Sequence, residues 1–149
     1  MGERFVVMDV GGTTLRTACY LPGDRLEAIR RTPTDGIARH PGSPADLLQP
    51  RVVGQIAAEA ASVLRDTGAT AVGIAFAGPV TDAGVVLGAP TVWGAGGARL
   101  PLADLLRERL GVPVVVVNDL TAAGHRYVEG PGDPPFCLIT VSSGIGNKV

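Results

Sequence analysis

The first part of the chain has the alternating and continuous apolar segments that are typical of β-strands. Residues 4–10 are apolar enough to form a central strand, and residues 15–21 and 25–32 carry further strand-like patterns. A Pro-Gly-Asp turn signal at 22–24 separates the second segment from the third. These patterns predict three consecutive strands joined by hairpins.

Helical and strand patterns alternate along the rest of the chain. Apolar residues recur at helical spacing over 52–67, and Gly68 is placed to end that helix. We expect Pro50 to interrupt or kink any helix that begins earlier, at 43–46. The other expected elements are a strand over 70–76, a hairpin-like turn over 80–87, a helix over 100–110, a strand over 112–117, a helix from 120 and a strand over 136–141. Three strands followed by helix–strand units predict an α/β fold of the RNase H-like type, with a mixed sheet flanked by helices.

Composition supports a globular domain and argues against several classes of partner. Hydrophobic residues make up 46% and charged residues 18% of the 149 residues, which is enough apolar material for one packed core. The net charge is −1 without a basic face, so we expect no nucleic-acid binding. Glu3 and Arg4 argue against a signal peptide, and no apolar run approaches the ~20 residues of a membrane span. We therefore expect a cytoplasmic protein that binds no membrane.

A glycine turn follows the first strand and carries candidate phosphate and metal ligands. The strand leads into Asp9, and Gly11, Gly12 and Thr13 follow. Glycines permit positive φ and let backbone N–H groups approach an anion closely. Thr13 adds a hydroxyl, Arg16 adds a positive charge, and the Asp9 carboxylate is a suitable ligand for Mg²⁺. The alternative is a β-hairpin whose Gly-Gly turn only reverses the chain.

A second glycine turn of similar character follows the last expected strand. Thr140, Ser143, Gly144 and Gly146 form a neutral segment that is rich in hydrogen-bond donors. One short Gly-x-Gly segment is weak evidence for phosphate binding. Two such turns in one small chain favour the phosphate interpretation over the simple hairpin.

Asp119 is the candidate general base of the chain. It follows a buried strand, stands next to Asn118 and precedes a predicted helix, whose amino terminus stabilises negative charge. Aspartate is also a common helix N-cap, so Asp119 has a purely structural alternative. The two glycine turns favour the catalytic role, and both roles can coexist.

The order of these motifs resembles that of the ROK-family sugar kinases, which belong to the superfamily of actin, hexokinase and Hsp70-type ATPases. The motifs that carry the resemblance are Asp-Val-Gly-Gly-Thr at 9–13, the segment 73–80, Asn-Asp at 118–119 and the turn at 140–146. The resemblance implies an actin-like ATPase domain that uses ATP and Mg²⁺. It also implies that residues 1–149 are the amino-terminal lobe of a two-lobed kinase, truncated after the second glycine turn and inactive alone.

The resemblance assigns a role to each motif. Asp119 would take the proton of the acceptor hydroxyl, and Asp9 would hold Mg²⁺ beside the transferred phosphoryl group. The residues that would bind the nucleotide phosphates are Asp9, Gly11, Gly12, Thr13, Arg16, Thr140, Ser143, Gly144 and Gly146. The residues that would contact the acceptor are Gly78, Pro79, Thr91, Asn118 and Asp119.

Departures from the family pattern bear on the acceptor. Thr91 follows Pro90 where family members usually have Asn, and Thr121 replaces a second Asn after Asn118-Asp119. A pocket that loses hydroxyl-binding groups discriminates differently, so glucose and similar hexoses are doubtful acceptors. We expect phosphoryl transfer to a sugar or cyclitol hydroxyl, and a related polyol ring, such as the cyclitols of cyclitol-kinase-like members, is a candidate acceptor. The competing interpretation is a sugar-binding regulatory protein without turnover. The resemblance is compatible with a homodimer.

Overall fold

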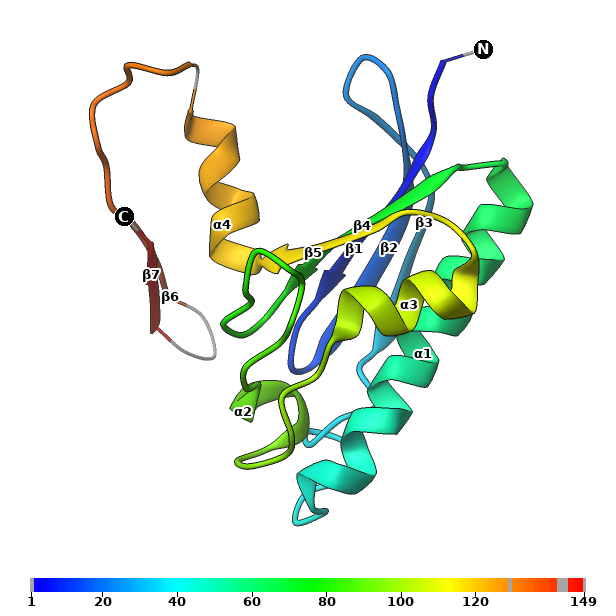
Figure 1. Cartoon of the computed structure of the whole chain (residues 1–149), viewed down its shortest axis with the longest axis vertical. Helices are drawn as coiled ribbons and strands as arrows, with labels where there is room; N and C mark the ends of the chain where they lie inside the picture. The colour runs from blue at the N-terminus through cyan, green and yellow to red at the C-terminus, as the bar shows by residue number, and fades with distance from the viewer. Residues whose placement is uncertain (1, 129, 142–144, 149) are drawn as a thin grey trace.

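The computed structural model describes residues 2–128, 130–141 and 145–148, and its main feature is a five-stranded mixed sheet (Figure 1). The strands lie in the order β3-β2-β1-β4-β5. Their bounds are Phe5–Val10 for β1, Thr14–Leu21 for β2, Arg25–Pro33 for β3, Ala71–Phe76 for β4 and Val114–Asn118 for β5. β1, β2 and β3 pair antiparallel, whereas β1, β4 and β5 run parallel. The predicted RNase H-like α/β fold with its mixed sheet is confirmed.

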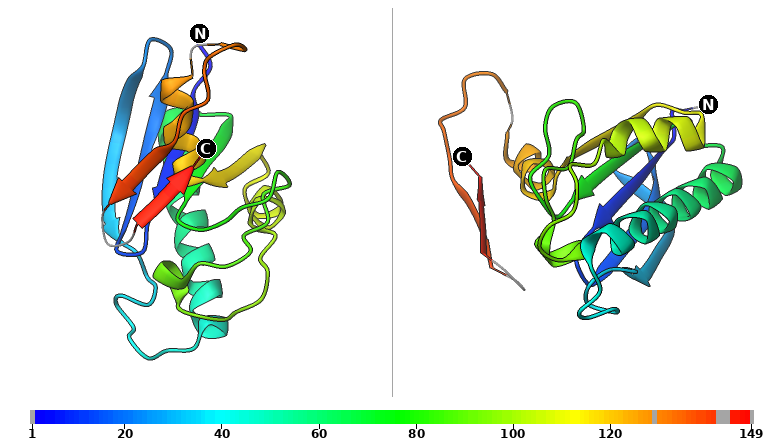
Figure 2. Two further views of the ribbon diagram at one scale, coloured as in Figure 1. Left: turned by 90° about the vertical axis from the view of Figure 1, so that its left-hand side faces the viewer. Right: turned by 60° about the horizontal axis from the view of Figure 1, so that its bottom comes forward.

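Helices flank this sheet, and a small second sheet lies beside it. α1 (Ala45–Thr67) and α3 (Leu102–Leu110) pack together on one side of the sheet, and α4 (Asp119–Gly124) lies on the other (Figures 1 and 2). The two further helical segments are α2 (Pro90–Trp93) and the 3₁₀ turn η1 (His125–Tyr127). β6 (Leu138–Val141) and β7 (Ile145–Lys148) form a separate antiparallel pair that contacts α4.

The core lies between the sheet and α1. Val6, Met8 and Val10 alternate with less buried residues along β1, so every second side chain enters the core. Ile56 and Ala60 of α1 are fully buried in the same cluster. Burial of these apolar faces supplies the main driving force for the fold. In the part of the chain that the structure describes, no helix is long and apolar enough to cross a membrane.

α1 differs from its prediction at its amino-terminal end. The helix runs without interruption from Ala45 to Thr67 and contains Pro50, so an interruption at Pro50 is wrong, and a kink there stays a prediction. Leu48 and Val52, on either side of Pro50, are buried, and their packing compensates for the hydrogen bond that proline does not donate. Gly68 ends the helix as predicted, with φ of 68° and its N–H donating to the carbonyl of Leu64 at 2.9 Å.

The segment between β4 and α3 is mostly irregular and contains no extended β-hairpin. The expected hairpin at 80–87 is reduced to a single bridge between Val80 and Val86, closed by a hydrogen bond from the Thr81 N–H to the Val85 carbonyl at 3.0 Å. α2 was not predicted, because one turn of helix is too short to show periodicity. This irregular segment brings α2 close to the first glycine turn.

Candidate active site

Three parallel strands end at one edge of the sheet, and candidate residues follow each of them. Val10 of β1, Phe76 of β4 and Asn118 of β5 lie in one row across the sheet. The N–H of Ala77 donates to the carbonyl of Val10 at 3.0 Å, which joins the segment after β4 to the end of β1. Ligands of open α/β sheets bind outside the carboxyl ends of parallel strands. The topology therefore brings the first glycine turn, the turn after β4 and the Asn-Asp pair to one place.

The first glycine turn is the connection of the β1–β2 hairpin. The N–H of Gly11 donates to the carbonyl of Thr14 at 3.0 Å. Neither Gly11 nor Gly12 has a positive φ, so the turn does not use the left-handed conformation that glycine permits. Glycine is required at position 12 for another reason, because a Cβ there would overlap the carbonyl oxygen of Thr91. The predicted β-hairpin is confirmed, whereas neither phosphate binding by this turn nor the alternative that it only reverses the chain is tested.

Asp9 and Arg16 face each other across this hairpin. They are cross-strand partners, and Nη1 of Arg16 donates to Oδ2 of Asp9 at 2.5 Å. Their side chains are 46% and 53% exposed, respectively, so the pair is accessible to a ligand. Among the described residues, nothing bonds the other oxygen of Asp9.

The donor set at Asp9 suits one kind of metal site. No group of three or more His, Cys, Asp or Glu residues that could hold a metal occurs within the described ranges. Mg²⁺ in kinases is held by one or two carboxylates together with phosphate oxygens and water. A single accessible carboxylate beside the glycine turn fits a Mg²⁺ ion that arrives with a nucleotide, and it does not fit a metal cage made by protein alone.

Asn118 forms the N-cap of α4. Its Oδ1 accepts hydrogen bonds from the backbone N–H groups of Leu120 at 3.1 Å and Thr121 at 3.2 Å. Its Nδ2 donates to the carbonyl of Gly78 at 2.8 Å and to Oδ1 of Asp119 at 3.0 Å. The alternative in which Asp119 serves only as the cap is therefore wrong. Both amide hydrogens and both lone pairs of Asn118 are engaged within the protein.

Asp119 is held by one of its two carboxylate oxygens. Oδ1 accepts hydrogen bonds from the N–H of Leu120 at 2.9 Å and from Asn118. The side chain is half-buried, and Oδ2 has no hydrogen-bond partner in the described part of the chain. One oxygen thus fixes the orientation of the carboxylate, and the other is available to accept a proton.

Gly78 and Pro79 form a tight turn directly after β4. A Cβ on Gly78 would overlap the carbonyl oxygen of Gly88, so close backbone contact requires glycine here. The carbonyl of Pro79 accepts a hydrogen bond from the N–H of Leu87 at 2.9 Å. The Gly78 carbonyl is bonded to Asn118, which ties this turn to the end of β5.

α2 brings Thr91 next to the first glycine turn. The Thr91 side chain is exposed, and its carbonyl lies against Gly12. Trp93 at the end of α2 is fully buried and packs against Phe76 with ring centroids 5.4 Å apart. The buried Trp93 anchors α2. Thr91, which was predicted to contact the acceptor substrate, therefore lies next to the turn that was predicted to bind phosphate.

The second glycine turn is only partly described. Thr140 of β6 and Gly146 of β7 are backbone partners, whereas Ser143 and Gly144 lie outside the described residues. α4 contacts both the five-stranded sheet and the β6–β7 pair (Figure 2). No hydrogen bond between described residues joins the two glycine turns, so their convergence on one phosphate chain stays a prediction.

Comparison with known proteins identifies the family. The chain matches the model of the ROK family over residues 6–149. The chain belongs to the ROK family.

Characterised relatives are kinases, and they are longer than this chain. A C(7)-cyclitol 7-kinase of Streptomyces hygroscopicus subsp. jinggangensis is 49% identical over 148 residues, which cover 97% of this chain and 42% of the relative. A 2-epi-5-epi-valiolone 7-kinase of Actinoplanes sp. is 33% identical over 144 residues, which cover 93% of this chain and 38% of the relative. The chain thus spans about two fifths of the length of these relatives.

Solved ROK structures share the fold. The ROK family glucokinase from Streptomyces griseus in complex with glucose and AMPPNP aligns with a TM-score of 0.72 and 29% identity. The match covers 97% of this chain and 43% of the glucokinase chain. The actin-like ATPase fold that the motifs suggested is therefore shown.

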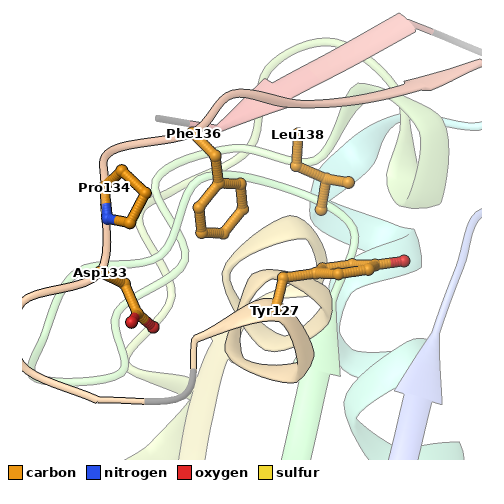
Figure 3. A pocket seen from close by; sticks show the side chains of 5 residues that line it. All are labelled: Tyr127, Asp133, Pro134, Phe136 and Leu138. Carbon is orange, nitrogen blue, oxygen red and sulfur yellow. The ribbon is translucent and has the colours of Figure 1, made fainter.

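An apolar pocket of about 430 Å³ in this ROK-family chain lies between the 3₁₀ turn after α4 and the segment that leads into β6 (Figure 3). The residues that line it are Tyr127, Asp133, Pro134, Phe136 and Leu138. Tyr127 and Phe136 meet edge to face with ring centroids 6.2 Å apart, and the Tyr127 hydroxyl points away from Asp133. None of the predicted site residues lines this pocket.

The sequence prediction missed Thr34, which contacts the first glycine turn of this ROK-family chain. Thr34 is fully buried and hydrogen-bonded to the carbonyls of Gly11 and Thr13. No periodicity or motif marks this position, because the contact joins segments that are distant in the sequence. Asn118 was assigned to the substrate, although Asn is as good an N-cap as Asp, and that signal was available.

Proposed function

We propose that the protein to which this chain belongs is an ATP- and Mg²⁺-dependent kinase that phosphorylates a hydroxyl of a cyclitol or related sugar. One observation carries the proposal. Asp119 lies at the carboxyl edge of the parallel strands, with one oxygen anchored by Asn118 and the other free of partners among the described residues. The chain would form the amino-terminal lobe of this kinase; its alignment with the C(7)-cyclitol 7-kinase covers 97% of this chain and only 42% of that relative.

The residues support a direct phosphoryl transfer. The oxygen of the acceptor hydroxyl attacks the γ-phosphorus of ATP, and Asp119 accepts the proton of that hydroxyl. The bond from the γ-phosphorus to the bridging oxygen breaks, and ADP leaves with that oxygen. The first glycine turn binds phosphate oxygens through backbone N–H groups, and Arg16 adds positive charge. Mg²⁺, held by Asp9 and the phosphates, would supply neutralisation of phosphate charge.

The named activity of the 49%-identical relative favours a C(7)-cyclitol as the acceptor. Thr91 in place of the usual Asn is consistent with an acceptor other than glucose, since it changes the hydrogen-bonding groups available beside the turn. The regulatory alternative requires no general base. The anchored Asp119 favours the enzyme.

The test uses the full-length protein with a panel of C(7)-cyclitols, hexoses and N-acetylated sugars. ADP release and the mass of the product are measured with and without Mg²⁺. We expect Mg²⁺-dependent transfer to a cyclitol that exceeds transfer to glucose. Binding of an acceptor without ADP release from any acceptor would contradict the kinase and support the regulatory protein.

A further inference from the structure

Thr34 holds both ends of the first glycine turn. Its Oγ1 donates to the carbonyl of Gly11 at 2.7 Å, and its backbone N–H donates to the carbonyl of Thr13 at 3.1 Å. The residue is 0% exposed, so neither bond competes with water. Thr34 therefore fixes the direction of two peptide carbonyls in the turn.

The direction of these carbonyls sets the direction of the neighbouring amides. A trans peptide is planar, so the N–H of Gly12 points opposite to the carbonyl of Gly11 and away from Thr34. Among the described residues, no backbone group accepts a hydrogen bond from the Gly12 N–H. The turn thus presents an unused donor whose orientation depends on the Thr34 hydroxyl, as an anion-binding loop requires.

The segment that carries Thr34 is itself anchored on two helices. The N–H of Asp35 donates to Oε1 of Gln55 in α1 at 2.8 Å, and the N–H of Ile37 donates to the carbonyl of Val92 in α2 at 2.8 Å. A Cβ on Gly36 would overlap that same Val92 oxygen, so this contact is between backbones. Thr34 is consequently a rigid support for the turn.

We propose that Thr34 is a positioning residue that orients the first glycine turn for the phosphates of a nucleoside triphosphate. The inference rests on the proposed kinase function. Valine has nearly the same shape as threonine, but it cannot donate to Gly11 and leaves that buried carbonyl without its partner. Removal of the hydroxyl should therefore loosen the turn while preserving the packing around position 34.

The test compares Thr34→Val and Thr34→Ser in the full-length protein, with Thr67→Val as the matched control. Thr67 also donates its hydroxyl to a backbone carbonyl, that of Val63 at 2.6 Å, but at the far end of α1. Calorimetry with a non-hydrolysable ATP analogue measures the Kd. Hydrogen exchange of the Gly12 and Thr13 amides without nucleotide reports on the turn itself.

We expect Thr34→Val to weaken binding of the analogue roughly tenfold, the effect of one lost hydrogen bond. It should raise KM for ATP without a matching rise in KM for the acceptor, and it should speed amide exchange in the turn. Thr34→Ser should restore the wild-type Kd, and Thr67→Val should change stability alone.

Two results would overturn the inference while leaving the kinase proposal intact. One is a Thr34→Val protein whose Kd for the ATP analogue and whose rate of amide exchange in the glycine turn equal those of Thr67→Val. The other, decisive if Thr34→Val does not fold, is a folded Thr34→Ser protein whose Kd is raised although its hydroxyl is retained. A wild-type protein that neither binds nor consumes ATP would overturn both proposals together.

Discussion

Nδ2 of Asn118 donates a hydrogen bond of 3.0 Å to Oδ1 of Asp119, its neighbour in the chain. The same amide group also donates to Gly78, and the carbonyl end of the side chain caps α4. One side chain therefore links the turn after β4, the end of β5, the start of α4 and the candidate base. This arrangement makes Asn118 a support for Asp119, in addition to any contact with an acceptor.

Replacing Asn118 should reduce both stability and turnover. Asn118→Ala removes the N-cap and the hydrogen bond to Asp119, so we expect about 1–2 kcal/mol less free energy of unfolding together with a lower kcat. Asn118→Ser retains a capping oxygen but no amide donor, so it should recover much of the stability and little of the kcat. Urea unfolding and ADP release in the full-length protein measure the two effects. Full activity of both variants would show that Asn118 is not needed to position Asp119.

Asp119→Asn should abolish most of the turnover without loss of acceptor binding. The amide is nearly isosteric, and its oxygen can keep the hydrogen bond from Leu120, but it cannot take a proton from the acceptor. We expect kcat to fall by ~10²–10⁴, the range for losing a general base. Asp104→Asn, at an exposed carboxylate paired with Arg107 on α3, is the matched control. Unchanged turnover in Asp119→Asn would exclude Asp119 from proton transfer.

The edge of the sheet that carries the candidate site was predictable from the sequence. The segments before Asp9 and before Asn118 are apolar enough for buried strands, and the carboxyl ends of parallel strands meet at one edge. The position of Asp119 after such a strand was therefore informative by itself. Its hydrogen bonds were not predictable, since they depend on which of two adjacent side chains faces the helix terminus.

Contacts between segments distant in the sequence escaped prediction. Position 12 requires glycine because the carbonyl of Thr91 lies against it, and buried Thr34 is hydrogen-bonded to the carbonyls of Gly11 and Thr13. Local patterns contain no information about either approach. Pro50 shows the same limit, because its helix is held by tertiary packing that outweighs a local breaking tendency.

Two glycines should respond to alanine in opposite directions. A Cβ on Gly12 would overlap the carbonyl oxygen of Thr91 and lie 2.9 Å from its carbonyl carbon. Backbone cannot yield as a flexible side chain does, so we expect Gly12→Ala to lower the free energy of unfolding by about 1–3 kcal/mol. Gly54 lies inside α1 with no atom within 4 Å of an added Cβ.

Gly54→Ala should accordingly raise the free energy of unfolding by about 0.5–1 kcal/mol, because alanine favours the helix. Urea unfolding of the full-length variants gives both values. A Gly12→Ala protein as stable as wild type would contradict the close contact of the glycine turn with α2. A destabilised Gly54→Ala protein would contradict the open space beside α1.

The loop that carries Thr34 should depend on the charge of Asp35. Nε2 of His40 lies 2.7 Å from Oδ1 of Asp35, and Nη2 of Arg51 lies 3.1 Å from Oδ2. Two hydrogen bonds lower the pKa of Asp35 below its usual value. The one with His40 has the larger effect, and the one with Arg51 has the second largest. The folded state therefore prefers the carboxylate more strongly than the unfolded chain does.

A lowered pKa contributes stability that is fully present above the unfolded pKa of about 3.9 and is lost as pH falls through the folded value. Asp35→Asn should therefore be less stable than wild type near pH 5, and the difference should shrink as pH falls below about 4. Arg51→Gln should remove only a fraction of the pH-dependent stability that the Asp35 carboxylate contributes, because the hydrogen bond with His40 remains. Urea unfolding of the full-length proteins at several pH values measures the difference. If the gap between wild type and Asp35→Asn persisted undiminished to pH 3, the anchoring of this loop would not depend on the ionised carboxylate.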